Sequence, residues 1–165
     1  MDKNDLVKAM LAIYIMGHSK DPNVGLTDPI NPVVTATNDV REQNGLPRLI
    51  QRDKLDTSAT AKSKDINNQG YWSHINPQGQ EPWVNITNAG YGYDKAGENL
   101  ARNMTDPEEI VRAWINSPEH KALIMNPNYT ETGAGTNGIY TTEHFATPIP
   151  TKKPTVWDYL TGKLK

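Results

Sequence analysis

The prolines near both ends of this chain limit where a compact domain can lie. Three of them stand at positions 22, 29 and 32, and three more at 148, 150 and 154. Proline breaks a helix interior and removes a hydrogen bond from a central strand, so neither element continues through these stretches. The sequence therefore predicts one domain over residues 32–149, preceded over 1–31 by an apolar helix and a proline-rich linker, and followed over 150–165 by a tail.

The N-terminal region contains one apolar run, AMLAIYIMG, which ends at Gly17. It is too short to cross a membrane, so we expect no transmembrane segment. Lys3 and Lys8 precede the run as they would in a signal peptide, but Asp2 and Asp5 oppose their charge. No convincing cleavage site of small residues follows. A retained helix is therefore favoured over a degenerate signal peptide.

Composition excludes some classes of function. The chain has 165 residues, a net charge of −2 and no cysteine. Its length is sufficient for one hydrophobic core. Because it has no basic stripe, we expect no nucleic-acid partner. The absence of cysteine rules out a disulfide scaffold and thiolate chemistry.

Hydrophobic spacing and capping residues predict three main helices. They cover residues 35–44, 53–69 and 106–125, with a break at Pro118 as an alternative within the third. The third begins with an Asp-Pro pair, which is typical of a helix start. In the second, buried positions recur at steps of three and four, and one of them is Lys62, a charged residue on the predicted inner face.

The second half of the chain predicts two strands, over 130–136 and 138–147, joined by a tight turn. The segment 71–101 shows no long period and is predicted as a loop with a short helix from Pro82 to Ala89. Helices on either side of a small, mainly antiparallel sheet indicate an α+β layered domain.

Four side chains are candidates for chemistry: His74, Glu98, His120 and His144. Imidazole and carboxylate held together can transfer protons or bind a metal ion, and zinc sites without cysteine favour this combination. The sequence has no HExxH motif or other close ligand spacing. For each histidine, the ordinary interpretation is a hydrogen-bonded surface or core residue, and for Glu98 a carboxylate that caps a turn.

Five segments occur in a specific order and spacing: REQNGLPRL, GYWSHINPQGQEPW, AGENLA, AWINSPEHKALIMNPNYTETGAG and YTTEHFA. Together they closely resemble the bacterial branch of the CAP superfamily, which comprises cysteine-rich secretory, antigen 5 and pathogenesis-related 1 proteins. The resemblance runs from about Val34 to Pro148. It implies a three-layer α–β–α sandwich in which His74 and Glu98 line a central cleft that His120 also enters.

The last strand departs from the family pattern, which usually reads aromatic-x-T-Q-x-F. YTTEHFA has Glu143 in place of the glutamine. In that register Tyr140 takes the position of the family's final cleft histidine, and His144 is a neighbour. A second register aligns EHFAT with the eukaryotic GHYTQ and makes His144 the cleft residue, but Phe145 followed by Ala146 favours the first. Because side chains alternate along a strand, only one of Glu143 and His144 can face the cleft.

The resemblance implies a binding module that is envelope-associated, secreted or virion-borne. Its cleft would hold a divalent cation, with zinc expected first and magnesium or calcium as alternatives. It would also hold an extended ligand such as a glycan, a peptide or a lipid headgroup. The expected ligand-binding residues are His74, Glu98, His120, Tyr140, Glu143 and His144, and the expected metal ligands are His74, Glu98 and His120.

Two other functions stay open. The first is a metal-assisted hydrolase of peptidase or nuclease type, in which His74 and His120 hold the ion and Glu98 activates water. The second is a structural component of a larger surface or phage assembly, which would dock a protein partner through the terminal extensions. All three imply an extracellular, particle-associated or cell-surface location.

Overall fold

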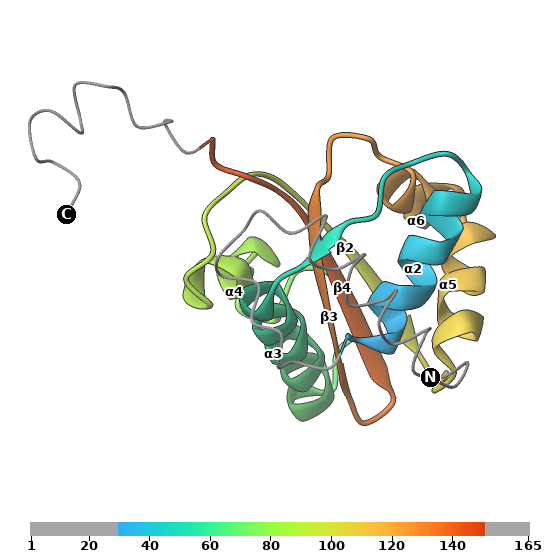
Figure 1. Ribbon diagram of the computed structural model, residues 1–165. Coiled ribbons are helices and arrows are strands. Elements are labelled where there is room, and N and C mark those ends of the chain that lie inside the picture. The colour runs from blue at the N-terminus through green and yellow to red at the C-terminus, as the bar shows by residue number, and fades with distance from the viewer. Residues whose placement is uncertain (1–29, 151–165) are drawn as a thin grey trace, which may run out of the picture.

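The computed structural model describes residues 30–150, so the expectations for the two terminal extensions lie outside the described residues. Within this range the chain forms three layers, with the sheet between two sets of helices (Figure 1). Helices α3 and α4 cover one face of the sheet, and α2, α5 and α6 lie on the other. The helices are α2 (Pro32–Gln43), α3 (Asp53–Gln69), α4 (Trp83–Asn88), α5 (Pro107–Ile115) and α6 (Pro118–Ile124). The predicted α+β class and α–β–α sandwich are confirmed.

The sheet has four strands in the order β1-β3-β4-β2. They are β1 (Ile50–Gln51), β2 (Tyr93–Arg102), β3 (Glu131–Asn137) and β4 (Tyr140–Pro148). The pairs β3–β4 and β4–β2 are antiparallel, whereas β1 runs parallel to β3. The sheet is therefore mainly antiparallel, as predicted, and β3 and β4 match the two predicted strands closely.

One prediction about the sheet is wrong. The segment that contains Glu98 was expected to be a loop, but it forms strand β2 at the edge of the sheet. The pattern gave no strand signal because residues 97–101 are all buried, polar and apolar alike, so exposed and buried residues do not alternate.

The helix starts follow from local chemistry. Asp106 caps α5 by accepting the backbone N–H of Glu109 at 2.9 Å. Asn31, which the sequence did not single out, caps α2 through its side chain. Ser117 occupies the cap position of α6 but makes no side-chain capping bond. The predicted third helix is divided there, since α5 ends before the proline that begins α6.

Two glycines allow α3 to pack directly on β3. A Cβ on Gly133 would lie 2.3 Å from the backbone nitrogen of Asp56, and one on Gly135 would lie 2.2 Å from Oγ1 of Thr60. Both distances are far inside van der Waals contact. Any side chain at these positions would therefore force the helix away from the sheet.

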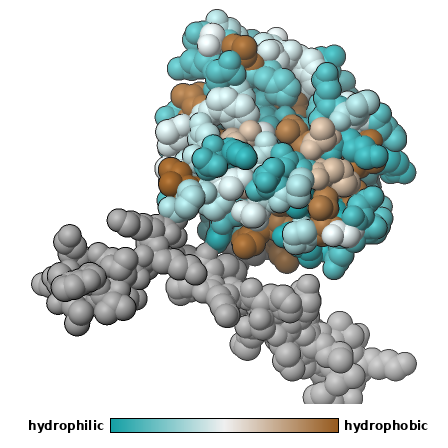
Figure 2. Space-filling view, turned by 90° about the horizontal axis from the view of Figure 1, so that it is seen from above, coloured by the Kyte–Doolittle hydropathy of each residue, from teal (hydrophilic) through white to brown (hydrophobic). Residues whose placement is uncertain are grey.

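The larger hydrophobic core lies between the sheet and the α2, α5 and α6 layer, where Trp114 and Phe145 are its largest completely buried members. The surface is mixed. In Figure 2 the apolar residues of the displayed face stand singly or in small groups among hydrophilic ones. Among residues 30–150, no helix has the length and apolar character needed to span a membrane.

Candidate functional site

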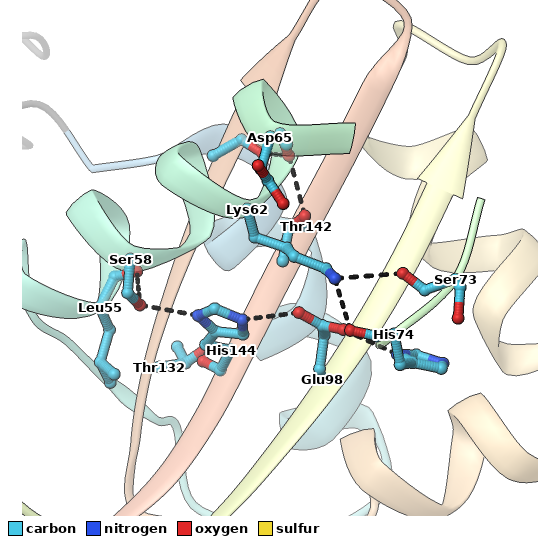
Figure 3. Close-up of polar contacts among 12 residues, drawn as sticks. Leu55, Ser58, Lys62, Asp65, Ser73, His74, Glu98, Thr132, Thr142 and His144 are labelled. Atoms are coloured by element: carbon cyan, nitrogen blue, oxygen red, sulfur yellow. Dashed lines mark hydrogen bonds and ion pairs between the residues drawn. The ribbon is translucent and has the colours of Figure 1, made fainter. Parts of the chain in front are cut away.

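Glu98 is the centre of a polar cluster on the α3 side of the sheet (Figure 3). Its Oε1 lies 2.7 Å from Nδ1 of His74, and its Oε2 lies 2.9 Å from Nε2 of His144. The Glu98 side chain is 1% exposed, although β2 is an edge strand. Each carboxylate oxygen therefore has an imidazole partner, and almost no surface of the group is left for water.

The residue before Glu98 explains how the strand fits at this point. Gly97 has an ordinary extended backbone, so the freedom of glycine is not what the position requires. A Cβ there would instead lie 2.7 Å from the hydroxyl of Tyr129. The glycine makes room for Tyr129 on one face of β2, while Glu98 projects from the other face.

His144 continues the cluster into the interior. Its Nδ1 lies 2.7 Å from Oγ of Ser58, and the Ser58 hydroxyl lies 2.9 Å from the carbonyl oxygen of Leu55. A hydroxyl has one proton to donate. When Ser58 donates to Leu55, its oxygen is free to accept from Nδ1 of His144.

The order serine, histidine, carboxylate resembles a nucleophilic triad, but it cannot act as one here. Ser58 and His144 are each 0% exposed, and Ser58 lies within helix α3 against the sheet. No substrate carbonyl can approach a hydroxyl in that position. The cluster is therefore a buried hydrogen-bond chain, and His74 is its one solvent-facing end, with a side chain that is 52% exposed.

Lys62 fixes the loop that carries His74. The side chain is 1% exposed, and its ammonium group donates to the carbonyl oxygens of Ser73 at 3.1 Å and His74 at 2.5 Å. It also donates to the hydroxyl of Tyr71, which in turn donates to Asp65. Burial lowers the pKa of Lys62, and the nearby charges of Glu98 and Asp65 oppose that change. The residue that the sequence presented as an irregularity thus anchors the site.

The pKa of Glu98 reflects these contacts. Burial alone would raise it, but hydrogen bonds from His144 and His74 outweigh that effect and hold the pKa below its ordinary value. The charge of Lys62 acts in the same direction. The carboxylate is thus ionised at neutral pH and is a poor proton acceptor.

His120 lies near the cluster without entering its hydrogen-bond chain. Its carbonyl oxygen accepts from Nδ2 of Asn99 at 3.2 Å. Burial lowers the pKa of the imidazole, and the charge of His74 lowers it further, so His120 is neutral at neutral pH. Within residues 30–150 its ring nitrogens make no hydrogen bond.

The three residues of β4 that were predicted to bind a ligand lie on two different faces of the sheet. His144 and Tyr140 face α3, but only His144 contacts Glu98, its direct cross-strand partner. Tyr140 instead stacks on Trp72 at 5.9 Å between ring centroids, and the guanidinium of Arg102 lies 4.8 Å from the centroid of the same indole. The pairing fits the second register, in which His144 is the cleft histidine.

Glu143 faces the α2 side and takes no part in this cluster. It is completely buried, and its carboxyl oxygens lie 2.8 Å from Oγ1 of Thr37 and 3.0 Å from Oγ1 of Thr132. Burial raises its pKa to about 8. Thr132 also donates to the carbonyl oxygen of His144. A protonated Glu143 can then donate to Thr132, which is the role that a glutamine amide would fill.

The same geometry bears on the predicted ion site. Among residues 30–150, no group of three histidine, aspartate or glutamate side chains is arranged to hold a metal ion. Glu98 already has an imidazole nitrogen on each oxygen, and the His74 nitrogen nearest to it is one of these. Zinc binding by His74, Glu98 and His120 is therefore a prediction that the residues in this arrangement do not favour.

Solved structures share this arrangement of helices and strands. An extracellular protein of Bacillus anthracis that contains an SCP domain superposes with a TM-score of 0.67 at 25% identity, over 73% of this chain and 45% of its own. A cysteine-rich secretory protein of Staphylococcus aureus superposes with a TM-score of 0.61 at 17% identity, over 74% of this chain and 40% of its own. The fold is that of the SCP class of domains.

The chain belongs to the CAP family, the cysteine-rich secretory protein family, whose profile matches residues 34–146. The protein YkwD of Bacillus subtilis is 41% identical over 103 residues, which are 62% of this chain and 40% of YkwD. The membrane protein YlbC of the same organism is 28% identical over 113 residues, which are 68% of this chain and 33% of YlbC. The matched region thus spans less than half the length of either relative.

Proposed function

We propose that this CAP domain is a binding module that does not hydrolyse its ligand. One observation carries the proposal: Glu98, the carboxylate at the centre of the cluster, is 1% exposed and has both oxygens bound by imidazoles. A general base needs a free lone pair within reach of the proton that it removes. Each Glu98 oxygen is directed at an imidazole, and the buried side chain lacks the access that water activation requires.

The solvent-facing end of the cluster is where we place the ligand. Nδ1 of His74 is used by Glu98, which leaves Nε2 of its half-exposed ring to bind a ligand. His120 has an unpaired neutral imidazole close by, and Trp72, two residues before His74 in the sequence, is 41% exposed. Imidazole nitrogens and an indole surface suit an extended ligand with polar groups, whether a glycan, a peptide or a lipid headgroup.

A location outside the cytoplasm is part of the same proposal. The Bacillus anthracis structure that this domain resembles at 25% identity is described as an extracellular protein. Association with an envelope or a particle, and docking through residues 1–31 or 150–165, stay proposals of the same kind.

The test combines binding with product analysis on the full chain. Three probes represent the ligand classes: an N-acetylglucosamine trisaccharide, trialanine, and vesicles of phosphatidylglycerol. Imidazole NMR signals report binding at His74 and His120, and mass spectrometry of the soluble probes and extracted lipid reports cleavage. We expect at least one probe to shift these signals saturably, His74→Ala to weaken that binding, and no probe to be cleaved.

Two outcomes would overturn the proposal. Cleavage of a probe by the wild type but not by Glu98→Gln would establish the hydrolase. If none of the three probes shifts the imidazole signals of His74 or His120, the ligand does not bind at this end of the cluster.

A further inference from the structure

A second polar feature lies outside the histidine–glutamate cluster. A surface hollow of about 290 Å³ opens between α3, α4 and the loop that contains Asn76 and Gln80. Its size is close to the lower limit of about 300 Å³ for pockets that hold small ligands. Of the histidines within residues 30–150, none lines it.

Helical spacing explains which residues meet there. On α3, Ala61, Lys64, Asp65 and Asn68 follow the steps of three and four that place side chains on one helix face. On α4, Asn85 and Asn88 are three residues apart and face the same space. The lining is dominated by carboxamides, namely Asn68, Asn76, Gln80, Asn85 and Asn88.

Most of these carboxamides are available to a ligand. Within residues 30–150, the side chains of Asn68, Asn85 and Asn88 make no hydrogen bond. Asn76 is different, because its Oδ1 accepts from the backbone nitrogens of Gln78 at 3.1 Å and Gln80 at 2.8 Å. Asn76 therefore fixes the loop, while the amides on the two helices stay free.

The charge of the hollow is balanced. Lys64 brings one positive charge and Asp65 one negative charge, and Asp65 already accepts from Gln69 at 2.6 Å and from Tyr71. A phosphate or a nucleic acid would need several cationic groups, which this lining lacks. A neutral ligand suits it better.

We propose that this hollow binds a neutral glycan, a role separate from the function proposed for His74 and His120. Each carboxamide offers a donor and an acceptor together, which matches sugar hydroxyls that also donate and accept. The methyl groups of Ala61 and Val84 supply a small apolar floor for a sugar ring. An extended peptide is recognised mainly by a strand edge or by apolar pockets, whereas mostly polar side chains from two helices and a loop form this lining.

The experiment titrates the ¹⁵N-labelled full chain with the N-acetylglucosamine trisaccharide and follows backbone and side-chain amide signals. We expect saturable shifts at Asn68 and Asn85. The substitutions Asn68→Ala and Asn85→Ala should each weaken the affinity about tenfold, since each removes hydrogen bonds to the ligand. Asn67→Ala is the matched control, because Asn67 is a neighbouring amide on α3 that bonds to Asn137 outside the hollow.

The result that overturns the proposal is equally specific. It would be the absence of saturable shifts at Asn68 and Asn85, or equal affinity in Asn68→Ala and Asn67→Ala. Shifts of these signals by trialanine or inorganic phosphate in place of the trisaccharide would overturn the ligand class. His74→Ala should leave these shifts unchanged, so failure of this site and failure of the proposed function are distinguishable.

Discussion

Glu98 and His144 lie directly opposite each other on β2 and β4, and their side chains meet at 2.9 Å in a region where both are almost completely buried. Cross-strand partners on one face of a sheet are held at a fixed spacing by the backbone ladder. The carboxylate is thus positioned by the sheet itself, and its second oxygen is left for His74 at the surface. This pair joins the folded core to the proposed ligand site.

Replacing Glu98 by Gln tests the energetic role of that carboxylate. The amide keeps the shape but offers only one acceptor to two imidazoles, so we expect a loss of about 2–3 kcal/mol in the free energy of unfolding at neutral pH. The pKa of Glu98 is held below its ordinary value of 4.5. Its contribution is therefore present above that value and is lost as pH falls through the lowered pKa. Urea unfolding across acidic pH should show a shallower loss for Glu98→Gln than for the wild type.

The matched control for this prediction is Glu119→Gln, which changes an exposed carboxylate on α6. It should stay within about 0.5 kcal/mol of the wild type. If both variants lose the same stability, the hydrogen bonds of Glu98 do not stabilise the fold.

Glu143→Gln should stabilise the protein, whereas Glu98→Gln should destabilise it. Burial raises the pKa of Glu143 to about 8, against the effect of its hydrogen bonds with Thr37 and Thr132 and of the charge of Arg41. The neutral carboxyl is favoured in the fold, so stability is greatest at acidic pH and falls as pH rises from about 4.5 to about 8. The variant should become more stable than the wild type across this interval, by at most about 5 kcal/mol. Thermal melting over that pH range measures the difference, and parallel curves for the two proteins would contradict it.

Lys62→Met tests whether the buried ammonium holds the His74 loop. Methionine has a similar length but cannot donate to the carbonyl oxygens of Ser73 and His74. We expect faster hydrogen exchange of the backbone amides in residues 71–76, and a loss of about 1–3 kcal/mol in stability. The control is Lys64→Met, which removes an exposed ammonium from the same helix. Unchanged exchange in the loop of Lys62→Met would show that other contacts position His74.

Zinc provides a further test of the site. Because Glu98 is already bound by His74 and His144, we expect zinc at neutral pH to leave the melting temperature of the wild type nearly unchanged. An ion that binds only the folded state would stabilise it by about 2.7 kcal/mol at a hundredfold excess over its dissociation constant. A clear rise that disappears in His74→Ala and His120→Ala would instead establish the three-ligand ion site.

Local patterns predicted most of the helices and the last hairpin. The Asp-Pro pair at the start of α5 caps the helix through a hydrogen bond within three residues. This helix start can therefore be predicted without knowledge of the tertiary structure. The family motifs then identified His74 and Glu98 as neighbours, although they are 24 residues apart in the sequence.

The edge strand and the role of Lys62 were beyond local prediction. β2 carries Glu98 and Asn99 into buried positions, where partners from other elements bind both Glu98 oxygens and Nδ2 of Asn99, so no polar–apolar alternation marks the strand. Lys62 was visible only as a charge on an apolar helix face. Its partners are carbonyl oxygens of a loop, and a sequence does not show where backbone groups will gather.

The two glycines of β3 determine how closely α3 approaches the cluster, although neither glycine belongs to it. With Gly133 and Gly135 in place, α3 lies against the sheet, and Ser58 and Lys62 reach His144 and the His74 loop. A methyl group at either position would lift the helix and lengthen these contacts together. Mutational scans confined to the histidines and Glu98 would therefore overlook the positions that set the spacing of the whole site. A redesign of this domain for a new ligand can therefore move α3 by changing the two glycines on the strand that faces it.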